Sequence, residues 1–410
     1  MYPATVPPAT INLENDSAFM ADPFPAFDRW AQSSPVHRAR TPDGSTVWLV
    51  THYLDVKAAL SDRRLSLNKA NSRTGYRGYT LPPALDANLL NLDPPDHTRL
   101  RRLVSQAFTA RRMANLRPRV QEITDDLLNA IARAGRADLI AGLAAPLPVT
   151  VIGELLGVPV AERQAFRTWT TTLISSQDPA RAAAAVVDIQ RYLSDLIATK
   201  RITPGDDLLT AMIAARDEDD RLSEDELTSL AFLVLWAGYE ATVDLIGNGL
   251  LELLRRPGQI ALLRTQPALV VNAVEELLRY TAPNPYAIRR FATEDLVVGG
   301  QTISAGDSVL LCLASAHRDP EQFPEPDILN VTRSNIGHYG FGHGIHYCLG
   351  APLARLEAEI AIGTVLRRFP ALALDDSDPP RWRSSFRSRG LLCLPVVHAV
   401  DGSRKGEAST

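Results

Sequence analysis

The feature that most constrains the fold is a long apolar segment between Ser223 and Arg256. Ser223 and Glu226 match a capping box, in which two side chains satisfy free N–H groups at the start of a helix. The middle of the segment is almost continuously apolar, and a helix without a polar face has to be buried on nearly every side. The sequence therefore predicts one long central helix that is enclosed by the rest of the fold.

Length and composition agree with a large soluble domain. The chain has 410 residues, of which 45% are hydrophobic and 22% charged, close to globular averages. We find no Pro/Gly/Ser-rich linker, no repeat and no abrupt change of charge. We therefore expect a single domain over residues 22–400, an extended segment over residues 1–21 and a disordered tail over residues 401–410.

Local patterns predict several smaller elements. Two short segments, 36–40 and 46–50, flank Asp43-Gly44 and indicate a hairpin. Strands are also expected at 296–298, 301–303, 308–313 and 390–397, and further helices at 23–32, 53–60, 110–134, 149–157, 161–175, 180–200, 206–217 and 269–280. Residues 64–92 lack a periodic pattern, which is typical of a functional or mobile segment.

Several functional classes are disfavoured. The formal net charge is −4, and no basic stretch is interleaved with aromatic residues, so nucleic-acid binding is not expected. Three cysteines do not suggest a disulfide framework and fit a reducing compartment. The N-terminus has neither a basic nor an apolar signal region, and Glu240 and Asp244 interrupt the most apolar stretch. We therefore expect a cytoplasmic protein without a membrane anchor.

A glycine-rich loop from Phe341 to Arg355 contains a single cysteine, Cys348. Glycines at 340, 342 and 344 allow positive φ and close approach to a flat ligand, and a helix is predicted to begin near Pro352. N–H groups at a helix N-terminus lower the pKa of a thiol. The loop is thus suited to holding a soft metal by sulfur.

Three interpretations of Cys348 compete on these residues alone. A lone cysteine is most often an inert, buried apolar side chain. His343, His346 and Cys348 could instead bind zinc, but no second cluster at finger-like spacing completes a tetrahedral set. In the third interpretation Cys348 is a haem thiolate, for which one sulfur suffices because the porphyrin supplies four nitrogens.

The loop resembles the haem-binding signature of the cytochrome P450 family, with each defining position filled: Phe341, Gly342, Gly344, His346, Cys348, Gly350, Leu353, Ala354 and Arg355. The resemblance implies that Cys348 is the fifth ligand of the iron, that Phe341 packs beside the sulfur, and that His346 reaches a haem propionate. Gly342 and Gly350 belong to the same cofactor-binding loop.

Two more segments resemble the propionate-binding elements of this family. His97 and Arg101 lie four residues apart after Pro94-Pro95, hence on one helix face, which by spacing alone is more often a solvated basic face. The resemblance implies that they bind a propionate through charge-assisted hydrogen bonds. The segment from Pro283 to Phe291 is similar to the strand that supplies a further arginine; we assign Arg290, or Arg289 if the register slips by one residue.

The central helix contains Ala237-Gly238-Tyr239-Glu240-Ala241-Thr242, which resembles the oxygen-activation motif. Ala237 and Gly238 would lie over the haem, and Glu240 would be buried rather than partly exposed. Ala241 occupies the position of the usual proton-delivering alcohol, and Thr242 is turned about 100° away around the helix axis. Some macrolide-oxidising members share this departure. We therefore hypothesise that the substrate supplies part of the proton relay.

Glu276 and Arg279 resemble the family's buried pair that braces the cysteine loop; Ile328 is predicted where the usual third partner, an arginine, would stand. The resemblance covers about residues 22–397 and implies the P450 fold, mainly α with a small β region, that buries one haem b.

The implied activity is a haem-thiolate monooxygenase. It uses O2 and two electrons from a ferredoxin-type or flavin-containing donor to hydroxylate or epoxidise a small hydrophobic secondary metabolite such as a polyketide or macrolide. The protein is expected to be a monomer. The alternatives are a peroxide-using or oxidative-coupling enzyme and a non-catalytic haem-binding or sensor protein.

Overall fold

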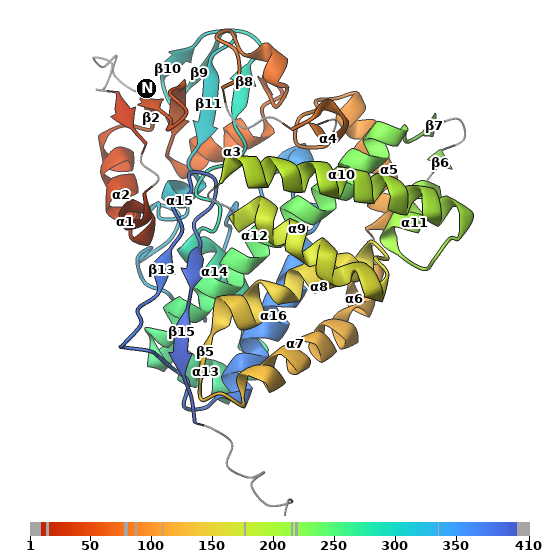
Figure 1. Cartoon of the computed structure of the whole chain (residues 1–410). Helices are drawn as coiled ribbons and strands as arrows, with labels where there is room; N and C mark the ends of the chain where they lie inside the picture. Colours follow the sequence, from red (N-terminus) through yellow and green to blue (C-terminus); the bar gives the residue numbers. More distant parts are fainter. Residues whose placement is uncertain are drawn as a thin grey trace, which may run out of the picture.

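The computed structural model describes residues 10–13, 16–77, 81–86, 88–108, 110–175, 178–214, 216–217, 220–334 and 336–399. A strand-rich region containing β2, β8, β9, β10 and β11 occupies one side of the molecule, and the helices fill the other (Figure 1). One large hydrophobic cluster lies among the helices, and two smaller clusters lie against the strands. The mainly α fold with a small β region is confirmed.

The central helix is α12, which runs from Glu224 to Leu254. The capping box is present, because Ser223 accepts from the Glu226 N–H and the Glu226 carboxylate accepts from the Ser223 N–H. Helices α8 (Pro146–Leu155), α10 (Pro179–Ile202), α14 (Val270–Thr281) and α16 (Ala351–Arg368) all pack against it. Its apolar circumference is thus covered by other helices, as predicted.

Within the described residues, α12 is the one helix that is long and apolar enough to cross a membrane, and 67% of its most apolar stretch is buried inside the protein. That burial is typical of the core helix of a globular fold.

The remaining helices surround this core or cover the sheet. They are α1 (Ser17–Ala21), α2 (Phe24–Ser33), α3 (Tyr53–Ser61), α4 (Pro83–Asp86), α5 (Asp96–Ala107), α6 (Ala110–Asn115), α7 (Arg117–Ile131), α9 (Arg163–Ser175), α11 (Leu208–Ala214), α13 (Pro257–Thr265) and α15 (Leu313–Ala316). A π-helical turn, Ile140–Ala144, precedes α8.

The largest sheet has the strand order β1-β2-β3-β11-β8-β4. Its strands are β1 (Ile11–Asn12), β2 (Val36–Arg40), β3 (Thr46–Val50), β11 (Ser308–Leu311), β8 (Arg290–Ala292) and β4 (Leu65–Ser66). β3 and β11 are parallel, whereas β11 and β8 are antiparallel. Because β8 pairs with β11 in this sheet, Arg290 stands at a fixed position beside the helical region.

The small strands outside this sheet form four further pairs or triplets. They are β5 (Arg136–Asp138), β6 (Arg216–Asp217), β7 (Asp220–Arg221), β9 (Leu296–Val298), β10 (Gln301–Ile303), β12 (Ala373–Leu374), β13 (Arg381–Trp382), β14 (Leu391–Cys393) and β15 (Pro395–Val397). β13 pairs with β14, and we call residues 381–393 the C-terminal hairpin.

Several local predictions are confirmed and others are corrected. The hairpin at 36–50 has the predicted residues, with Gly44 at φ +80° in its turn. Residues 17–21 form α1, capped by Asp16, rather than an extended segment. The helix predicted over 110–134 is two helices, because Pro118 lacks the N–H that would continue the hydrogen-bond ladder.

The strands predicted over residues 283–291 and 390–397 are shorter in the structure. Of 283–291 only its end, in β8, is a strand, and 390–397 divides into β14 and β15, which pair with different neighbours. Within 64–92, the described residues form only β4, one short 3-10 turn and α4. The predictions for residues 1–9 and for the tail over 401–410 lie outside the described residues.

Candidate active site at the cysteine loop

The cysteine loop is a tight turn that leads directly into α16. Gly342 and Gly344 have φ +74°, a conformation that glycine adopts without strain. The Cys348 N–H donates to the Phe341 carbonyl at 2.8 Å, which closes the loop. Gly340 is not among the glycines with positive φ; a Cβ there would lie 3.2 Å from His338 Nδ1, so close packing explains this residue instead.

The pKa of Cys348 is not lowered as the loop geometry suggested. The residue has accessible surface, but protein atoms surround it closely enough that burial raises the pKa of its thiol. The N–H groups of Gly350 and Ala351 and the charge of Arg101 lower this pKa, in the expected direction, without outweighing burial. The prediction of a net lowering is therefore wrong for the polypeptide by itself.

A group of basic side chains gathers beside this loop. The rings of His97 and His346 lie 4.2 Å apart between centroids, and Arg290 is only 4% exposed. Burial, followed by the charges of His97 and Arg290, lowers the pKa of His346 to about 4. Arg101 belongs to the same group. Its positive charge lowers the pKa of both His97 and His346, although burial lowers each pKa more. The structure thus brings together the four residues that the sequence analysis selected from three segments.

Several nitrogen atoms of these side chains make no hydrogen bond to the described residues. Both ring nitrogens of His97 and Nε of Arg290 are buried without a hydrogen-bond partner among the described residues. Arg290 Nη1 makes a long contact of 3.4 Å to the Leu65 carbonyl. Because a buried donor without an acceptor costs free energy, the site fits an anionic group with several acceptor oxygens.

The alternative residue, Arg289, is engaged elsewhere. Its guanidinium lies 3.0 Å from the Asp43 carboxylate and 3.2 Å from the Thr41 hydroxyl, both in the first hairpin. The observed register therefore places Arg290, and not Arg289, beside His97 and His346.

The central helix presents small side chains on its accessible face. Ala237 is exposed and Ala241 is half-buried, and residues four apart lie on the same face of a helix. The Thr242 hydroxyl donates to the Gly238 carbonyl at 2.9 Å, one turn back in the same helix. A Cβ at Gly238 would lie 3.0 Å from Ile152 Cδ1, so glycine here lets α8 pack closely against α12.

Glu240 is buried, as the resemblance implied, and is only 7% exposed. Its carboxylate accepts from the Ser388 hydroxyl at 2.8 Å and lies 3.2 Å from the Arg387 guanidinium, both in the C-terminal hairpin. The interpretation as a partly exposed carboxylate is therefore wrong. Sequence reasoning missed these partners, which lie about 150 residues further along the chain.

A second buried carboxylate, Asp244, follows Glu240 after one helical turn. Its Oδ2 accepts from Arg383 at 2.7 Å, and its Oδ1 has no partner in the described part of the chain. Burial raises the pKa of Asp244 to about 7, while Arg383 acts against that shift. The sequence signal for this cluster is the four-residue spacing of Glu240, Asp244 and Asn248 in an otherwise apolar helix.

The buried Glu276–Arg279 pair has a third partner that the sequence analysis placed wrongly. Glu276 accepts two hydrogen bonds from Arg279 at 2.8 Å and two from Arg333 Nε at 3.1 Å. Ile328, the predicted position, contributes only its carbonyl, and its side chain is 51% exposed. The three-residue network is therefore complete, with Arg333 supplied five residues later.

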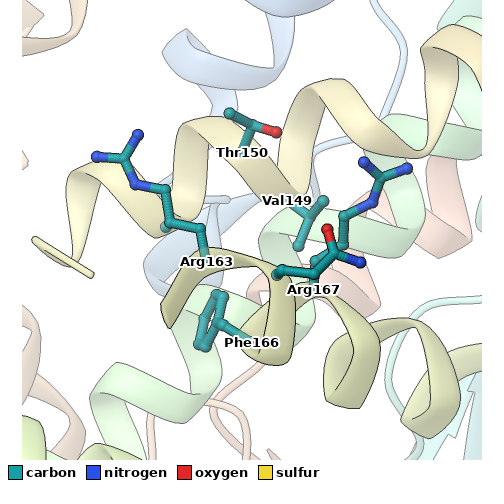
Figure 2. A pocket seen from close by; sticks show the side chains of 7 residues that line it. Val149, Thr150, Arg163, Phe166 and Arg167 are labelled. Carbon is teal, nitrogen blue, oxygen red and sulfur yellow. The ribbon is translucent and has the colours of Figure 1, made fainter. Parts of the chain in front are cut away.

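Two cavities open elsewhere on the helical region. One of about 110 Å³ lies between α8 and α9; Val149 and Thr150 of α8 and Phe166 of α9 line it, and the guanidinium groups of Arg163 and Arg167 extend at opposite ends (Figure 2). Another of about 410 Å³ lies among α7, α13 and α16. Neither is lined by the residues selected above. Within the described residues no three His, Cys, Asp or Glu side chains gather as a metal site, so the zinc interpretation has no ligand set there.

Comparison with known proteins agrees with this geometry. The family model for cytochrome P450 matches residues 166–396, more than half of the chain. The chain belongs to the cytochrome P450 family and is a monooxygenase that uses haem-thiolate iron, O2 and electrons from a redox partner. The alternatives of a peroxide-using or coupling enzyme and of a sensor protein are not favoured.

Individual relatives are similar along nearly their whole length. Cytochrome P450 monooxygenase PikC from Streptomyces venezuelae is 49% identical over 92% of this chain and 91% of its own length. The 6-deoxyerythronolide B hydroxylase of Saccharopolyspora erythraea is 44% identical over 94% of this chain and 98% of its own. Among solved structures, the tirandamycin C-bound monooxygenase TamI has a TM-score of 0.87, with 46% identity over 95% of this chain and 100% of that one.

Proposed function

We propose that this monooxygenase hydroxylates or epoxidises a polyketide or macrolide intermediate of secondary metabolism. The support comes from two similar proteins whose names specify a compound: 6-deoxyerythronolide B for one and tirandamycin C for the other. Ala237 is exposed and Ala241 half-buried on α12, and their short side chains are compatible with a bulky molecule beside this face. We further propose a soluble, cytoplasmic monomer that receives electrons from a ferredoxin.

The proposed cofactor is haem b, with Cys348 as the thiolate ligand of its iron. The observation that carries this assignment is the set of unpartnered buried nitrogens beside the cysteine loop: both His97 ring nitrogens and Arg290 Nε. In the proposal His97 and Arg290, with Arg101 and His346, bind the propionates and so orient the porphyrin. Phe341 and the glycines at 342 and 350 enclose the sulfur.

The haem, when bound, supplies the oxygen-activating chemistry; the polypeptide orients the substrate and controls protons. Ala241 offers no hydroxyl, the Thr242 hydroxyl is bonded to its own helix, and Glu240 is bonded to the C-terminal hairpin. None of these three residues presents a free proton donor on the accessible face of α12. The proposal that a substrate hydroxyl positions part of the proton relay follows from this arrangement.

The test is turnover of 6-deoxyerythronolide B and tirandamycin C with NADPH, ferredoxin and ferredoxin reductase under ¹⁸O2. We expect at least one product that carries a single ¹⁸O atom, and no oxygenated product, labelled or unlabelled, when hydrogen peroxide replaces the electron donors. Product formation from peroxide alone would favour the alternative enzyme class. Oxidation of lauric acid with neither polyketide transformed would contradict the substrate class, and a deoxygenated analogue turned over with undiminished coupling would contradict the proton relay.

A further inference from the structure

Three polar residues of α12, Glu240, Asp244 and Asn248, follow one another at intervals of one helical turn, and we call them the polar stripe. Each forms a hydrogen bond to the C-terminal hairpin. Glu240 accepts from the Ser388 hydroxyl at 2.8 Å, and Asp244 accepts from Arg383 at 2.7 Å. Asn248 donates from Nδ2 to the Arg389 carbonyl at 2.7 Å. All three stripe residues are buried, so this side of α12 is fitted to one particular segment of chain.

Arg383 is the residue that links the whole cluster. Its Nη2 contacts Asp244, donates to the Ser388 hydroxyl at 2.9 Å and lies 3.4 Å from the Glu240 carboxylate. The two carboxylates are thus opposed by two guanidinium groups, Arg383 and Arg387. Glu240, Asp244 and Arg383 are buried, whereas the Arg387 side chain is 52% exposed, so loss of the Arg383 charge would leave the two buried carboxylates without their buried counter-charge.

The backbone of the hairpin also approaches α12 too closely for an ordinary side chain. A Cβ on Gly390 would lie 1.8 Å from Asp244 Oδ1 and 2.8 Å from Arg383 Nη2. The Arg383 N–H donates to the Gly390 carbonyl at 2.9 Å, which joins the two sides of the hairpin at this point. The contact between hairpin and helix is therefore set by sterics as well as by charge.

The tip of this hairpin, residues 384–388, contacts both α12 and the segment that precedes β8. Arg387 lies over the Trp236 ring at 5.1 Å, and Trp236 precedes the exposed Ala237 in the helix. Phe386 stacks on Tyr286 with centroids 5.0 Å apart, and Tyr286 lies in the segment that leads to Arg290. The tip is therefore placed relative to the central helix and to the propionate side at once.

We propose that Arg383 is a positioning residue: by clamping the hairpin tip to Glu240 and Asp244, it fixes where the substrate lies above Ala237 and Ala241 and keeps Glu240 withdrawn from proton delivery. This inference rests on the proposed function for its substrate. Loss of the clamp would release the tip and admit water to the accessible face of α12, so a larger share of the electrons from NADPH would reduce O2 to H2O2 (O2 + 2 e⁻ + 2 H⁺) instead of supporting oxidation of the substrate.

The experiment compares the haem-loaded wild type with Arg383→Met and Asp244→Asn. Met keeps an unbranched apolar stem as far as the position of Nε and removes the charged guanidinium group, whereas Asn keeps the shape of Asp244 and serves if the first variant folds poorly. Arg381→Met is the matched control, since Arg381 is exposed in the same hairpin and contacts Cys393 Sγ at 3.0 Å. Hydrogen–deuterium exchange over residues 384–390 is measured without substrate, and peroxide formed per NADPH is measured with tirandamycin C.

We expect exchange over 384–390 to rise at least tenfold in both test variants and the peroxide fraction to rise at least threefold, with the carbon monoxide spectrum unchanged. The control variant, Arg381→Met, should match the wild type in hydrogen exchange, in peroxide fraction and in the carbon monoxide spectrum. Exchange and peroxide fraction both within twofold of wild type would overturn the inference, as would a lowered melting temperature accompanied by unchanged exchange at the tip. If the wild type leaves tirandamycin C untouched, that result counts against the proposed substrate, and the exchange measurement alone decides on the clamp.

Discussion

The buried carboxyl of Glu357 makes the stability of the protein depend on pH. Glu357 lies in α16, is 1% exposed, and its Oε2 has no partner among the residues described. Burial raises its pKa to about 8 from the ordinary 4.5. Between these two values the folded protein holds a proton that the unfolded chain releases. The free energy of unfolding therefore falls as pH rises through this window.

The size of the effect follows from the shift. One proton over the three pH units from 5 to 8 corresponds to about 4 kcal/mol, at about 1.36 kcal/mol per unit. Unfolding entropy is about 2.1 cal/mol/K per residue, so a domain of about 400 residues should lose about 5 °C in melting temperature. Glu357→Gln removes the titrating group, and we expect its melting temperature to fall by about 5 °C less than that of the wild type over the same range.

The assay is thermal unfolding of both haem-loaded proteins at pH 5, 6, 7 and 8 with one scan rate. The unpartnered amide that Glu357→Gln introduces should lower stability equally at every pH, so only the difference in slope is diagnostic. Glu359→Gln is the control, because Glu359 lies two residues further in the same helix and pairs with the exposed Arg117 at 2.7 Å. Parallel curves for the wild type and Glu357→Gln would refute the reasoning.

Two further changes test the buried contacts. Arg333→Leu should lower the free energy of unfolding by about 3 kcal/mol in denaturant titrations, because it leaves the Glu276 carboxylate undercompensated; Ile328→Ala should have little effect, and the reverse order would restore Ile328 as the key position. Gly390→Ala should reduce the melting temperature through its clash with Asp244, and this loss should be smaller when the same change is made in an Asp244→Ala background; an equal or larger loss in that background would contradict the steric explanation.

Features that depend on neighbouring residues could be predicted from the sequence. The capping box at Ser223 defined the start of α12, and Asp43-Gly44 defined the first hairpin, because each involves residues only a few positions apart. The glycine-rich loop around Cys348 likewise carries its geometry in its own residues. Recognition of the cytochrome P450 family followed from that loop, and the fold from the family.

Features that depend on the path of the chain could not be predicted. Arg333, rather than a residue at position 328, reaches Glu276, because the intervening turns decide which side chain points inward. The partners of Glu240 come from the C-terminal hairpin, whose approach to α12 has no local signal. The pKa of Cys348 was misjudged because the N–H groups are visible in the sequence, whereas the extent of burial is not.

The most direct test of the central claim is the absorption spectrum of the dithionite-reduced, carbon monoxide-bound protein, measured for the wild type and for Cys348→Ser. The account predicts a strongly red-shifted Soret band in the wild type that is absent from the variant, since only thiolate ligation produces that shift. A wild-type Soret band at the position of histidine-ligated haem, or the same red-shifted band in Cys348→Ser, would contradict the assignment of Cys348 as the iron ligand.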